Sequence, residues 1–434
     1  MAEFQPPPSD AAAARKAMAK VIAAVWRMES AQLIGGLTRR LGDLGMAEDL
    51  AQEALLVALE RWPETGVPDN PGAWLMATAK NRGLDHARHL QMRQRNHEAV
   101  AAVSPGNRDQ EPLEGALGDD TLRLMLIACH PILPVESRVA LTLKLLGGLT
   151  TPEIARALLQ PEPTVAQRIV RAKRTLGAAR VPFELPQRAE LGERIAALLE
   201  VIYLIFNEGY AASRGEDWLR PALCEDALRL GRCLAALMPD DSEVHGLLAL
   251  MELHASRHAS RVDMHGQPVL LLDQDRGAWD HLLIARGLSG LHRSAELARQ
   301  SAQPLGPYAL QAAISACHAR ARTAAQTDWP QIVALYDALL QLTQSPVVAL
   351  NRAVAVSMAD GPAAALELVE ELRDDPVLKN YRFLYAVLGD LLQRTGRLQE
   401  AGAAFAQAAD RSENAQERAI LAKRAGQCAA VVAA

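Results

Sequence analysis

Residues 164–176 concentrate positive charge in a chain whose net charge is −5. Val165, Ile169, Ala172 and Leu176 are spaced as one face of a helix, so the polar side chains fall on the other face. A basic helix face can enter the major groove, where arginine binds guanine edges and phosphates. The polar residues on offer are Thr164, Gln167, Arg168, Arg171, Lys173 and Arg174. The same pattern is also typical of a helix face that is only solvated.

A second short helix, predicted over residues 150–158, would position this basic helix. Thr150 or Thr151 can cap its first turn, and Glu153 lies near the positive end of the helix dipole. The elbow that follows holds Pro161 and Pro163, which cost little before or within the first turn of a helix. The two segments together predict a helix–turn–helix.

Another basic helix is predicted over residues 73–96, where five Lys or Arg residues surround a single acid, Asp85. The charge then changes sign, since residues 98–120 hold six acids and one arginine. That segment contains Pro and Gly without sustained periodicity, so we expect a flexible acidic linker. Two basic modules on a tether are typical of a bipartite DNA clamp, because each neutralised phosphate releases counterions.

The composition favours an all-α protein. Apolar residues make up 50 % and charged residues 22 % of 434 residues, and aromatic residues only 4 %. Ala, Leu, Arg, Glu and Gln dominate, and these are good helix formers. The five cysteines are scattered and never spaced C-x-x-C, which argues against a disulfide framework and favours a reduced, cytoplasmic compartment. No nucleophile–base pair, phosphate loop or catalytic carboxylate pair is present in the sequence, so we expect no enzymatic activity and no cofactor.

Boundaries in the sequence predict five parts: helical domains at residues 11–97, 121–181 and 188–290, the linker at 98–120, and a repeat region at 291–434. In the first part, Leu50, Ala54, Val57 and Leu59 are expected on the apolar side of a helix. In the last part, two stretches begin with glycines 35 residues apart, Gly361 and Gly396. This spacing is close to the helix–turn–helix period of about 34 residues in tetratricopeptide (TPR) arrays.

Two polar clusters in the C-terminal half are candidate sites. His254 and His258 are four residues apart, a spacing that can bind zinc, but no third ligand or catalytic Glu accompanies them, so we expect no metal. Asp273, Asp275, Arg276 and Trp279 could form a hinge or an interdomain contact. The alternative for this second cluster is a set of local turns and caps.

The order of the motifs resembles a known family. The segments "AEDLAQEALLVALERW", "PGAWLMATAKNRGLDHAR" and "LTTPEIARAL…TVAQRIVRAKRTL" are similar to regions 2.2, 2.3–2.4 and 4.2 of bacterial sigma-70 factors, in the extracytoplasmic-function (ECF) group. Segments such as "VIYLIFNEGYAAS" and "LLLDQDRGAWD" resemble the long helical, partly TPR-like extension of one branch of that group.

The resemblance implies a fold and a set of residue roles. It implies a region 2 bundle, the linker, a region 4 helix–turn–helix and a TPR-like helical extension. Core polymerase would be bound by Asp49, Gln52 and Glu53. The −10 element would be bound by Lys80, Asn81, Arg82, Asp85 and Arg88. The −35 element would be bound by Thr164, Gln167, Arg168 and Arg171, with Lys173 and Arg174 on the same helix.

The implied function is that of a sigma factor, which binds core RNA polymerase at the β′ clamp helices and β flap and starts transcription of a specific regulon from promoter DNA. The extension would act as a built-in regulator or bind a regulatory partner, and no membrane contact is expected. Two alternatives stay open. The protein could be a stand-alone helix–turn–helix regulator, or a TPR-type scaffold or ligand-binding protein with an accessory DNA-binding part.

Overall fold

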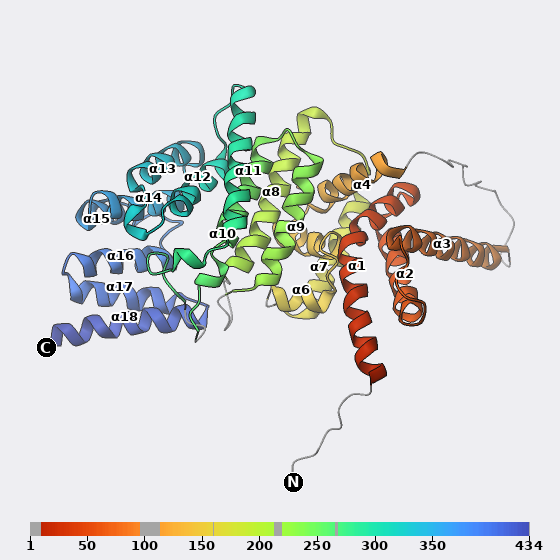
Figure 1. Ribbon diagram of the computed structural model, residues 1–434, viewed down its shortest axis with the longest axis horizontal. Coiled ribbons are helices and arrows are strands. Elements are labelled where there is room, and N and C mark those ends of the chain that lie inside the picture. The colour runs from red at the N-terminus through yellow and green to blue at the C-terminus, as the bar shows by residue number, and fades with distance from the viewer. Residues whose placement is uncertain (1–9, 96–112, 159, 212–218, 265–267, 434) are drawn as a thin grey trace, which may run out of the picture. The chain divides into compact units, whose positions relative to one another are not determined.

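The structure is a computed structural model that describes residues 10–95, 113–158, 160–211, 219–264 and 268–433. Over these residues the chain forms eighteen α-helices and three short 3-10 helices with no β-strand, which confirms the predicted all-α class. The chain divides into two compact units, Met1–Val201 and Ile202–Ala434. The bar of Figure 1 runs from red to green over unit 1 and from green to blue over unit 2.

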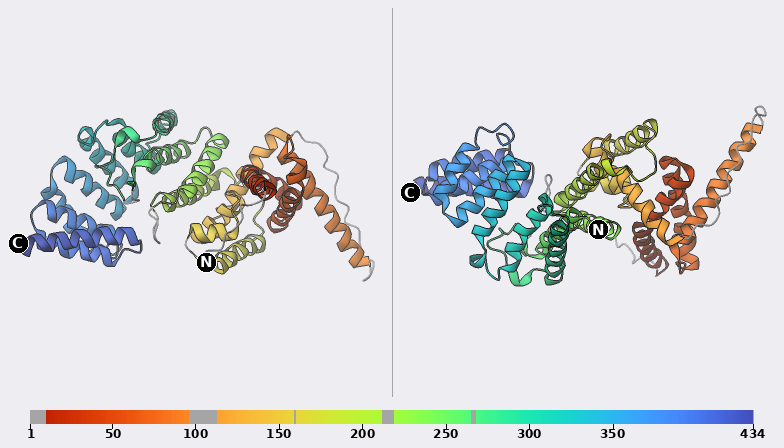
Figure 2. Two further views of the ribbon diagram at one scale, coloured as in Figure 1. Left: turned by 60° about the horizontal axis from the view of Figure 1, so that its bottom comes forward. Right: turned by 90° about the horizontal axis from the view of Figure 1, so that it is seen from above.

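Unit 1 contains two groups of helices. Its helices are α1 (Asp10–Leu41), α2 (Leu44–Thr65), α3 (Pro71–Arg95), α4 (Leu113–Ala128), α5 (Val135–Leu145), α6 (Thr151–Ala157) and α7 (Glu162–Ala178), and α8 (Arg188–Tyr210) continues into unit 2. The first group is α1, α2 and α3, in which α1 and α3 pack against α2, and the second group is α4, α5, α6 and α7. Figure 2 shows the C-terminal part of α3, in orange, extending beyond α1 and α2.

The core of the first group lies along one side of α2. Leu50, Ala54 and Val57 are buried there, as predicted. Leu59 was predicted on the same side but is 40 % exposed. A helix turns by about 100° per residue, so a residue nine positions after Leu50 lies half a turn away from it. Trp62, near the end of α2, is buried and packs edge to face against Trp74 of α3, with ring centroids 5.2 Å apart.

Two of the predicted boundaries need correction. The linker was predicted to run to residue 120, but Leu113–Ala128 is helix α4, and Asp120 is fully buried. Residues 98–112 of that prediction lie outside the described residues. The predicted boundary between residues 290 and 291 falls inside helix α11, which spans His281–Gln300. The boundary predicted there from the sequence therefore does not mark the end of a helix.

Unit 2 is a succession of helices, and Figure 1 shows α16, α17 and α18 side by side in blue. Its remaining elements are α9 (Pro221–Leu237), α10 (Ser242–Ala255), η1 (His258–Ser260), η2 (Arg276–Ala278), α11, α12 (Pro307–Arg320), η3 (Ala324–Gln326), α13 (Trp329–Thr343), α14 (Pro346–Ala359), α15 (Pro362–Glu371), α16 (Arg382–Arg394), α17 (Leu398–Asp410) and α18 (Ala415–Ala433).

The repeat predicted from two glycines corresponds to two helical hairpins. Gly361 joins α14 to α15 with φ 100°, and Gly396 joins α16 to α17 with φ 80°. Both values lie in the left-handed region, which glycine adopts without a Cβ clash. The two hairpins and α18 share one apolar core that includes Leu350, Leu388 and Phe405. Each hairpin can therefore bury its apolar face only against its neighbour, as in helical repeat proteins.

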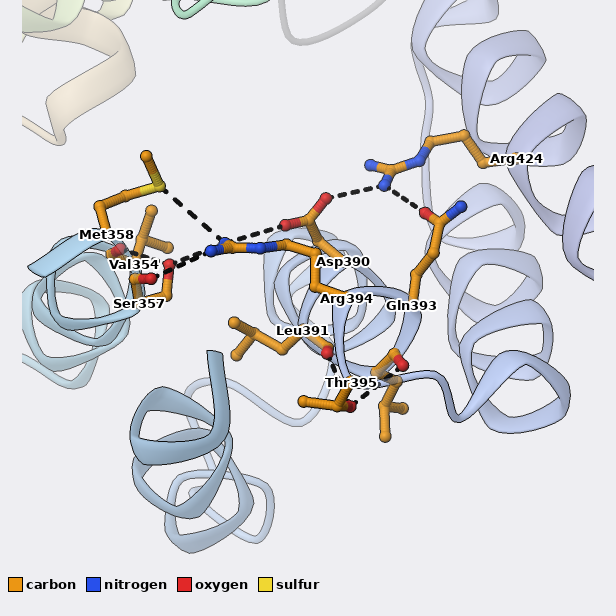
Figure 3. A network of polar contacts seen from close by, with 10 residues as sticks. Val354, Ser357, Met358, Asp390, Leu391, Gln393, Arg394, Thr395 and Arg424 are labelled. Atoms are coloured by element: carbon orange, nitrogen blue, oxygen red, sulfur yellow. Dashed lines mark hydrogen bonds and ion pairs between the residues drawn. The ribbon is translucent and has the colours of Figure 1, made fainter. Parts of the chain in front are cut away.

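A polar network connects the two hairpins (Figure 3). Arg394 of α16 donates to the hydroxyl of Ser357 at 3.1 Å and to the carbonyl oxygen of Ser357 at 3.0 Å. Arg424 of α18 donates to Asp390 and to Gln393, each at 2.7 Å. Because α14, α16 and α18 all contribute, the network fixes the register of one hairpin on the next.

Candidate nucleic-acid interface

Helix α6 begins with a capping box that fixes the first helix of the predicted helix–turn–helix. The Thr150 hydroxyl accepts from the Glu153 amide at 3.4 Å, and the Glu153 carboxylate accepts from the Thr150 amide at 2.7 Å. Burial raises the pKa of Glu153, but the hydrogen bonds from Thr150 and the nearby charge of Arg27 outweigh it and lower that pKa overall. The predicted cap at Thr150 is therefore confirmed.

Helix α7 has one buried and one exposed face, and its start is compatible with the prolines of the elbow. Pro161 is the N-cap residue, and Pro163 lies in the first turn. The predicted apolar stripe is confirmed, since Val165, Ile169, Ala172 and Leu176 are all buried. The residues of the predicted DNA-reading set that are exposed are Thr164, Gln167, Arg171 and Arg174. These four side chains therefore face the solvent.

Two residues of the same set are already engaged inside the protein. Arg168 is half-buried and donates to the side-chain oxygen of Gln160 in the turn before α7. Lys173 is also half-buried and forms an ion pair with Glu48 of α2. The structure therefore places Lys173 against α2 and not on the exposed face with Arg171.

Glu48 is the centre of a buried charge cluster, which we call the Glu48 cluster. It comprises Glu48, Gln52, Lys144 and Lys173. Glu48 is only 2 % exposed. Gln52 of the same helix donates to its carboxylate at 2.6 Å, and Lys144 of α5 approaches it at 3.7 Å. One carboxylate thus pairs with lysines from two helices of the second group, and this ties α2 to α5 and α7.

A second set of charges joins the two groups of helices through α1. Arg39 of α1 forms an ion pair with the buried Asp120 of α4 at 3.1 Å, and Arg123 pairs with the same carboxylate at 3.0 Å. Arg27 of α1 lies 3.8 Å from Glu153 of α6. The sequence reasoning missed Glu48, Lys144 and these partners, because residues so distant in sequence give no pattern that predicts their pairing.

The second basic helix is α3, and the residues in its middle are accessible. Asn70 accepts from the Ala73 amide at 3.0 Å and so stabilises the first turn. Lys80, Asn81 and Arg82 are exposed. The side chains of Asp85 and Arg88 lie outside the described residues, although helix α3 itself extends past both.

The three residues predicted to bind polymerase lie on α2. Asp43 caps this helix by accepting from the Met46 amide at 2.9 Å. Asp49 is exposed, whereas Gln52 and Glu53 are half-buried. Gln52 belongs to the Glu48 cluster, so in this arrangement only Asp49 is fully presented to a partner.

In unit 2, the predicted contact residues join the segment after α10 to the segment after α12. Arg276 is 7 % exposed and donates to the carbonyl oxygens of His318 at 2.8 Å and Ala321 at 3.0 Å, and to the Thr327 hydroxyl at 2.9 Å. Trp279 is buried, and the Arg276 guanidinium lies 5.2 Å from its ring centroid.

The two acids of that set have local roles. The Asp275 carboxylate accepts from the Gly277 amide at 2.9 Å and caps η2, and Asp273 is exposed. The prediction therefore divides into two parts: Arg276 and Trp279 make contacts between distant segments of unit 2, and Asp275 forms a local cap.

His254 and His258, whose spacing can bind zinc, lie in the interior of unit 2. Nε2 of His254 lies 2.9 Å from the Ser315 hydroxyl, and the His254 ring stacks on Tyr210 at 5.0 Å. Among the described residues, no group of three or more His, Cys, Asp or Glu residues is arranged to hold a metal ion.

Three families match parts of the chain. Sigma-70 region 2 matches residues 26–93, and Sigma-70, region 4, matches residues 123–176. A family of unknown function, DUF6596, matches residues 194–295. The first match begins in the middle of α1 and ends in α3, the second begins inside α4 and ends in α7, and the third begins in α8 and ends in α11.

Similar proteins cover either most of the chain or its N-terminal part. An uncharacterized protein of Rhizobium meliloti is 42 % identical over 394 residues, which are 90 % of this chain and 92 % of that protein. The probable ECF RNA polymerase sigma factor SigI of Mycobacterium tuberculosis is 30 % identical over 163 residues, 37 % of this chain and 56 % of SigI. The ECF RNA polymerase sigma factor SigL of the same species is 30 % identical over 169 residues, 39 % of this chain and 92 % of SigL.

None of the helices in the described ranges has the length and apolar character needed to cross a bilayer.

The two basic helices, α3 and α7, lie almost entirely within the two matched sigma-70 regions, and a helical extension follows them. The chain belongs to the sigma-70 family, as an ECF sigma factor with a C-terminal helical extension.

Proposed function

We propose that this sigma factor binds core RNA polymerase through α2 and recognises promoter DNA through α7 and α3. The exposed face of α7 is the observation that carries this proposal. Its buried stripe holds the helix on α5 and α6, so Gln167, Arg171 and Arg174 remain available outside. Glutamine and arginine are side chains that read base edges in the major groove, and arginine also binds phosphates.

In the proposal, the exposed residues of α7 contact the −35 element and α3 contacts the −10 element. Lys80, Asn81 and Arg82 are exposed in the middle of α3, where cations can follow the backbone of an opened strand. Asp85 and Arg88 come next along the same helix and complete the predicted −10 set.

The polymerase-binding role is assigned to α2, where Asp49 is exposed and Glu53 is half-buried. An acidic helix surface is complementary to a basic partner surface, and such complementarity increases the association rate. The proposed partner surfaces are the β′ clamp helices for α2 and the β flap for the second group of helices.

Unit 1 has to open for both DNA elements to be bound at once. Elements centred about 25 base pairs apart are separated by about 85 Å along a B-form duplex. In the arrangement described above, Lys173 of α7 is paired with Glu48 of α2. The residues between α3 and α4 number 17, and a fully extended chain of that length reaches at most about 60 Å. The helices on either side of it must therefore span the rest of the separation between the two elements. We propose that core polymerase separates the two groups, which exposes Gln52 and releases Lys173 to reach DNA.

The extension is proposed to regulate this process. Unit 2 follows the two sigma-70 regions in the sequence, and its stacked hairpins form the kind of surface that helical repeats use to bind partners. We propose α1 to α3 and α4 to α7 as the two promoter-binding domains, with α8 and everything after it as the regulatory part.

Run-off transcription with core polymerase tests the proposal. The full-length protein should support initiation at a promoter recovered by genome-wide binding, and it should co-elute with core polymerase in gel filtration. Arg171→Ala should reduce initiation while leaving co-elution unchanged, and Asp49→Arg should reduce both. Arg180→Ala is the matched control, because Arg180 is exposed just beyond the end of α7. Duplex binding without co-elution would instead favour a stand-alone regulator.

A further inference from the structure

Three arginines and two aromatic rings meet in the interior of unit 2, where the chain leaves α10 and enters α11. The Arg261 guanidinium lies 3.7 Å from the centroid of the Tyr210 ring. Arg257 lies between two rings, 5.8 Å from the Tyr210 centroid and 5.7 Å from that of Trp279. Arg276 covers Trp279 at 5.2 Å. We call these five residues the arginine cluster.

The cluster has no negative charge of its own. Within the described part of the chain, none of the three arginines forms an ion pair with a carboxylate. Arg257 donates to the Tyr210 hydroxyl at 2.6 Å, and Arg261 donates to the Tyr210 carbonyl oxygen. Other arginines of unit 2 do have carboxylate partners, such as Arg232, which binds the buried Glu252 at 2.9 Å.

Two acids near the cluster, Asp275 and Asp280, do not supply the missing charge. The Asp275 carboxylate accepts from the Gly277 amide, and the Asp280 carboxylate accepts from the Leu282 and Leu283 amides. Both therefore act as caps. Arg261 is only 8 % exposed, so water replaces little of the missing pairing. A buried charge without a partner is costly, and native proteins normally pair it.

Unpaired polar atoms are concentrated in and around the same cluster. Of the fourteen buried side-chain nitrogen and oxygen atoms without a hydrogen-bond partner in the described residues, six belong to this region. They are His254 Nδ1, His258 Nε2, Gln274 Oε1, Arg276 Nε, Trp279 Nε1 and His318 Nδ1. Arg276 Nε and Trp279 Nε1 are obligate donors. Clustered orphan donors in a native interior are explained when an acceptor from outside the chain binds there.

The neighbouring histidines are adapted to this positive environment. Burial, followed by the charges of Arg261 and Arg257, lowers the pKa of His258 to about 4. Burial, followed by Arg257 and Arg276, lowers that of His318 to about 4 as well. Neutral imidazoles can still donate one N–H each, so they add hydrogen-bonding capacity without adding repulsion.

We propose that Arg257 and Arg261 bind an oxyanion, carried as a phosphate or carboxylate group on a small molecule, with Trp279 Nε1 as an additional donor. Arg257 is only half-buried, which gives the anion a way in. A guanidinium offers two parallel N–H groups that fit the two oxygens of a carboxylate or phosphate. A cation is disfavoured by the three positive charges. This site goes beyond promoter recognition, because it lies wholly in unit 2.

Isothermal titration of the full-length protein with inorganic phosphate and with citrate tests the proposal, against sodium chloride at matched ionic strength. At least one of the two oxyanions should bind saturably, and whichever binds more tightly identifies the ligand group as phosphate or carboxylate. Arg257→Gln and Arg261→Gln should each weaken the binding by about tenfold or more, because each removes a charge-assisted contact. Arg352→Gln should change it less than about twofold, since Arg352 is partly exposed and already paired with Asp337 at 2.5 Å.

Arg257→Lys provides a second variant that keeps the charge and the fold while removing the planar fork. It should bind phosphate more weakly than the wild type and more tightly than Arg257→Gln. Far-UV circular dichroism checks that each variant is folded. The proposal is overturned if neither oxyanion saturates below about 10 mM, or if Arg257→Gln and Arg257→Lys both bind as the wild type does. Neither result bears on the sigma-factor function, because the assay contains no polymerase and no DNA.

Discussion

The Glu48 cluster of unit 1 and the arginine cluster of unit 2 both bury charge, but they balance it differently. Glu48 is surrounded by Lys144, Lys173 and the Gln52 amide, so the negative charge is neutralised by the chain itself. Among the described residues, Arg257 donates to the hydroxyl of Tyr210 and Arg261 to its carbonyl oxygen, and neither oxygen carries a charge. A buried charge with partners inside the chain can hold two parts of a protein together, whereas one without partners is suited to a ligand from outside.

This difference matches the two jobs proposed for the units. In unit 1 the pairing holds α2 to α5 and α7, which the proposed function requires to separate on DNA. In unit 2 the arginines that have no ion pair within the described residues lie between the end of α8 and the segment after α10. Unit 1 also displays positive charge on its surface, for example on the exposed Arg171 and Arg174 of α7.

The largest expected effect comes from Arg276, the arginine of the cluster whose terminal nitrogens donate three hydrogen bonds to distant parts of unit 2. Arg276→Met should lower the free energy of unfolding by about 2–4 kcal/mol, because it leaves the buried carbonyls of His318 and Ala321 without donors. Urea denaturation of the full-length protein measures this. Arg352→Met, at a partly exposed ion pair, should cost less than about 1 kcal/mol. Equal losses of unfolding free energy in the two variants would mean that the buried hydrogen bonds of Arg276 contribute no more than an exposed ion pair.

Substitution in the Glu48 cluster should lower the stability less than Arg276→Met does, because the lysines of the cluster remain partly exposed. Glu48→Gln keeps the shape and the contact with Gln52 but removes the charge that holds Lys144 and Lys173. We expect a loss of about 1–3 kcal/mol in the stability of unit 1, measured by urea denaturation. Glu64→Gln, exposed near the end of the same helix, should stay within about 0.5 kcal/mol of the wild type. An unchanged midpoint for Glu48→Gln would mean that the cluster does not hold α2 and α7 together.

Promoter affinity should depend on the outer face of α7. Arg171→Ala should weaken binding of the holoenzyme to promoter DNA by about 1–3 kcal/mol if the guanidinium reads a base, and it should relax specificity at one −35 position. Arg174→Ala should instead weaken all sequences similarly and reduce the salt dependence by about one ion. Fluorescence anisotropy at several salt concentrations separates the two cases. Salt slopes unaffected by Arg174→Ala would exclude a phosphate contact.

Acid should destabilise unit 2 through its buried histidines, with the smallest effect of the series. The pKa of His258 and that of His318 are about 4 in the folded state, against 6.5 for an ordinary histidine. Between these values the unfolded chain binds more protons, so stability falls as the pH drops from 6.5 towards 4. The double variant His258→Gln, His318→Gln should lose less stability between pH 7 and pH 5 than the wild type. A loss equal to that of the wild type would refute the assignment.

Local patterns in the sequence predicted the parts of the fold that depend on neighbouring residues. The stripe from Val165 to Leu176 was predicted because helical periodicity alone determines which face is buried. The cap at Thr150 and the turns at Gly361 and Gly396 follow from equally local preferences. Leu59 was predicted on the wrong face because it is apolar, although its position in the helix places it opposite Leu50.

Other features depend on tertiary contacts, and the sequence did not predict them. Lys173 has the same local setting as Arg174, yet it faces Glu48, which is 125 residues earlier in the chain. Asp120 looked like the end of an acidic linker, but Arg39 and Arg123 make it a buried residue of α4. Arg276 was proposed as a hinge or interdomain contact and binds the end of α12 within unit 2. Arg257 and Arg261 were missed, because an absent counter-charge can be recognised only once the neighbours are known.

Footprinting of the holoenzyme on a run-off promoter tests the central claim most directly, namely that the exposed face of α7 reads the −35 element. The account predicts protection at both elements with the wild-type protein, and with Arg171→Ala a loss of protection at −35 before any loss at −10. Protection at −35 that is identical in the wild type and in Arg171→Ala, or no protection there at all, would contradict it.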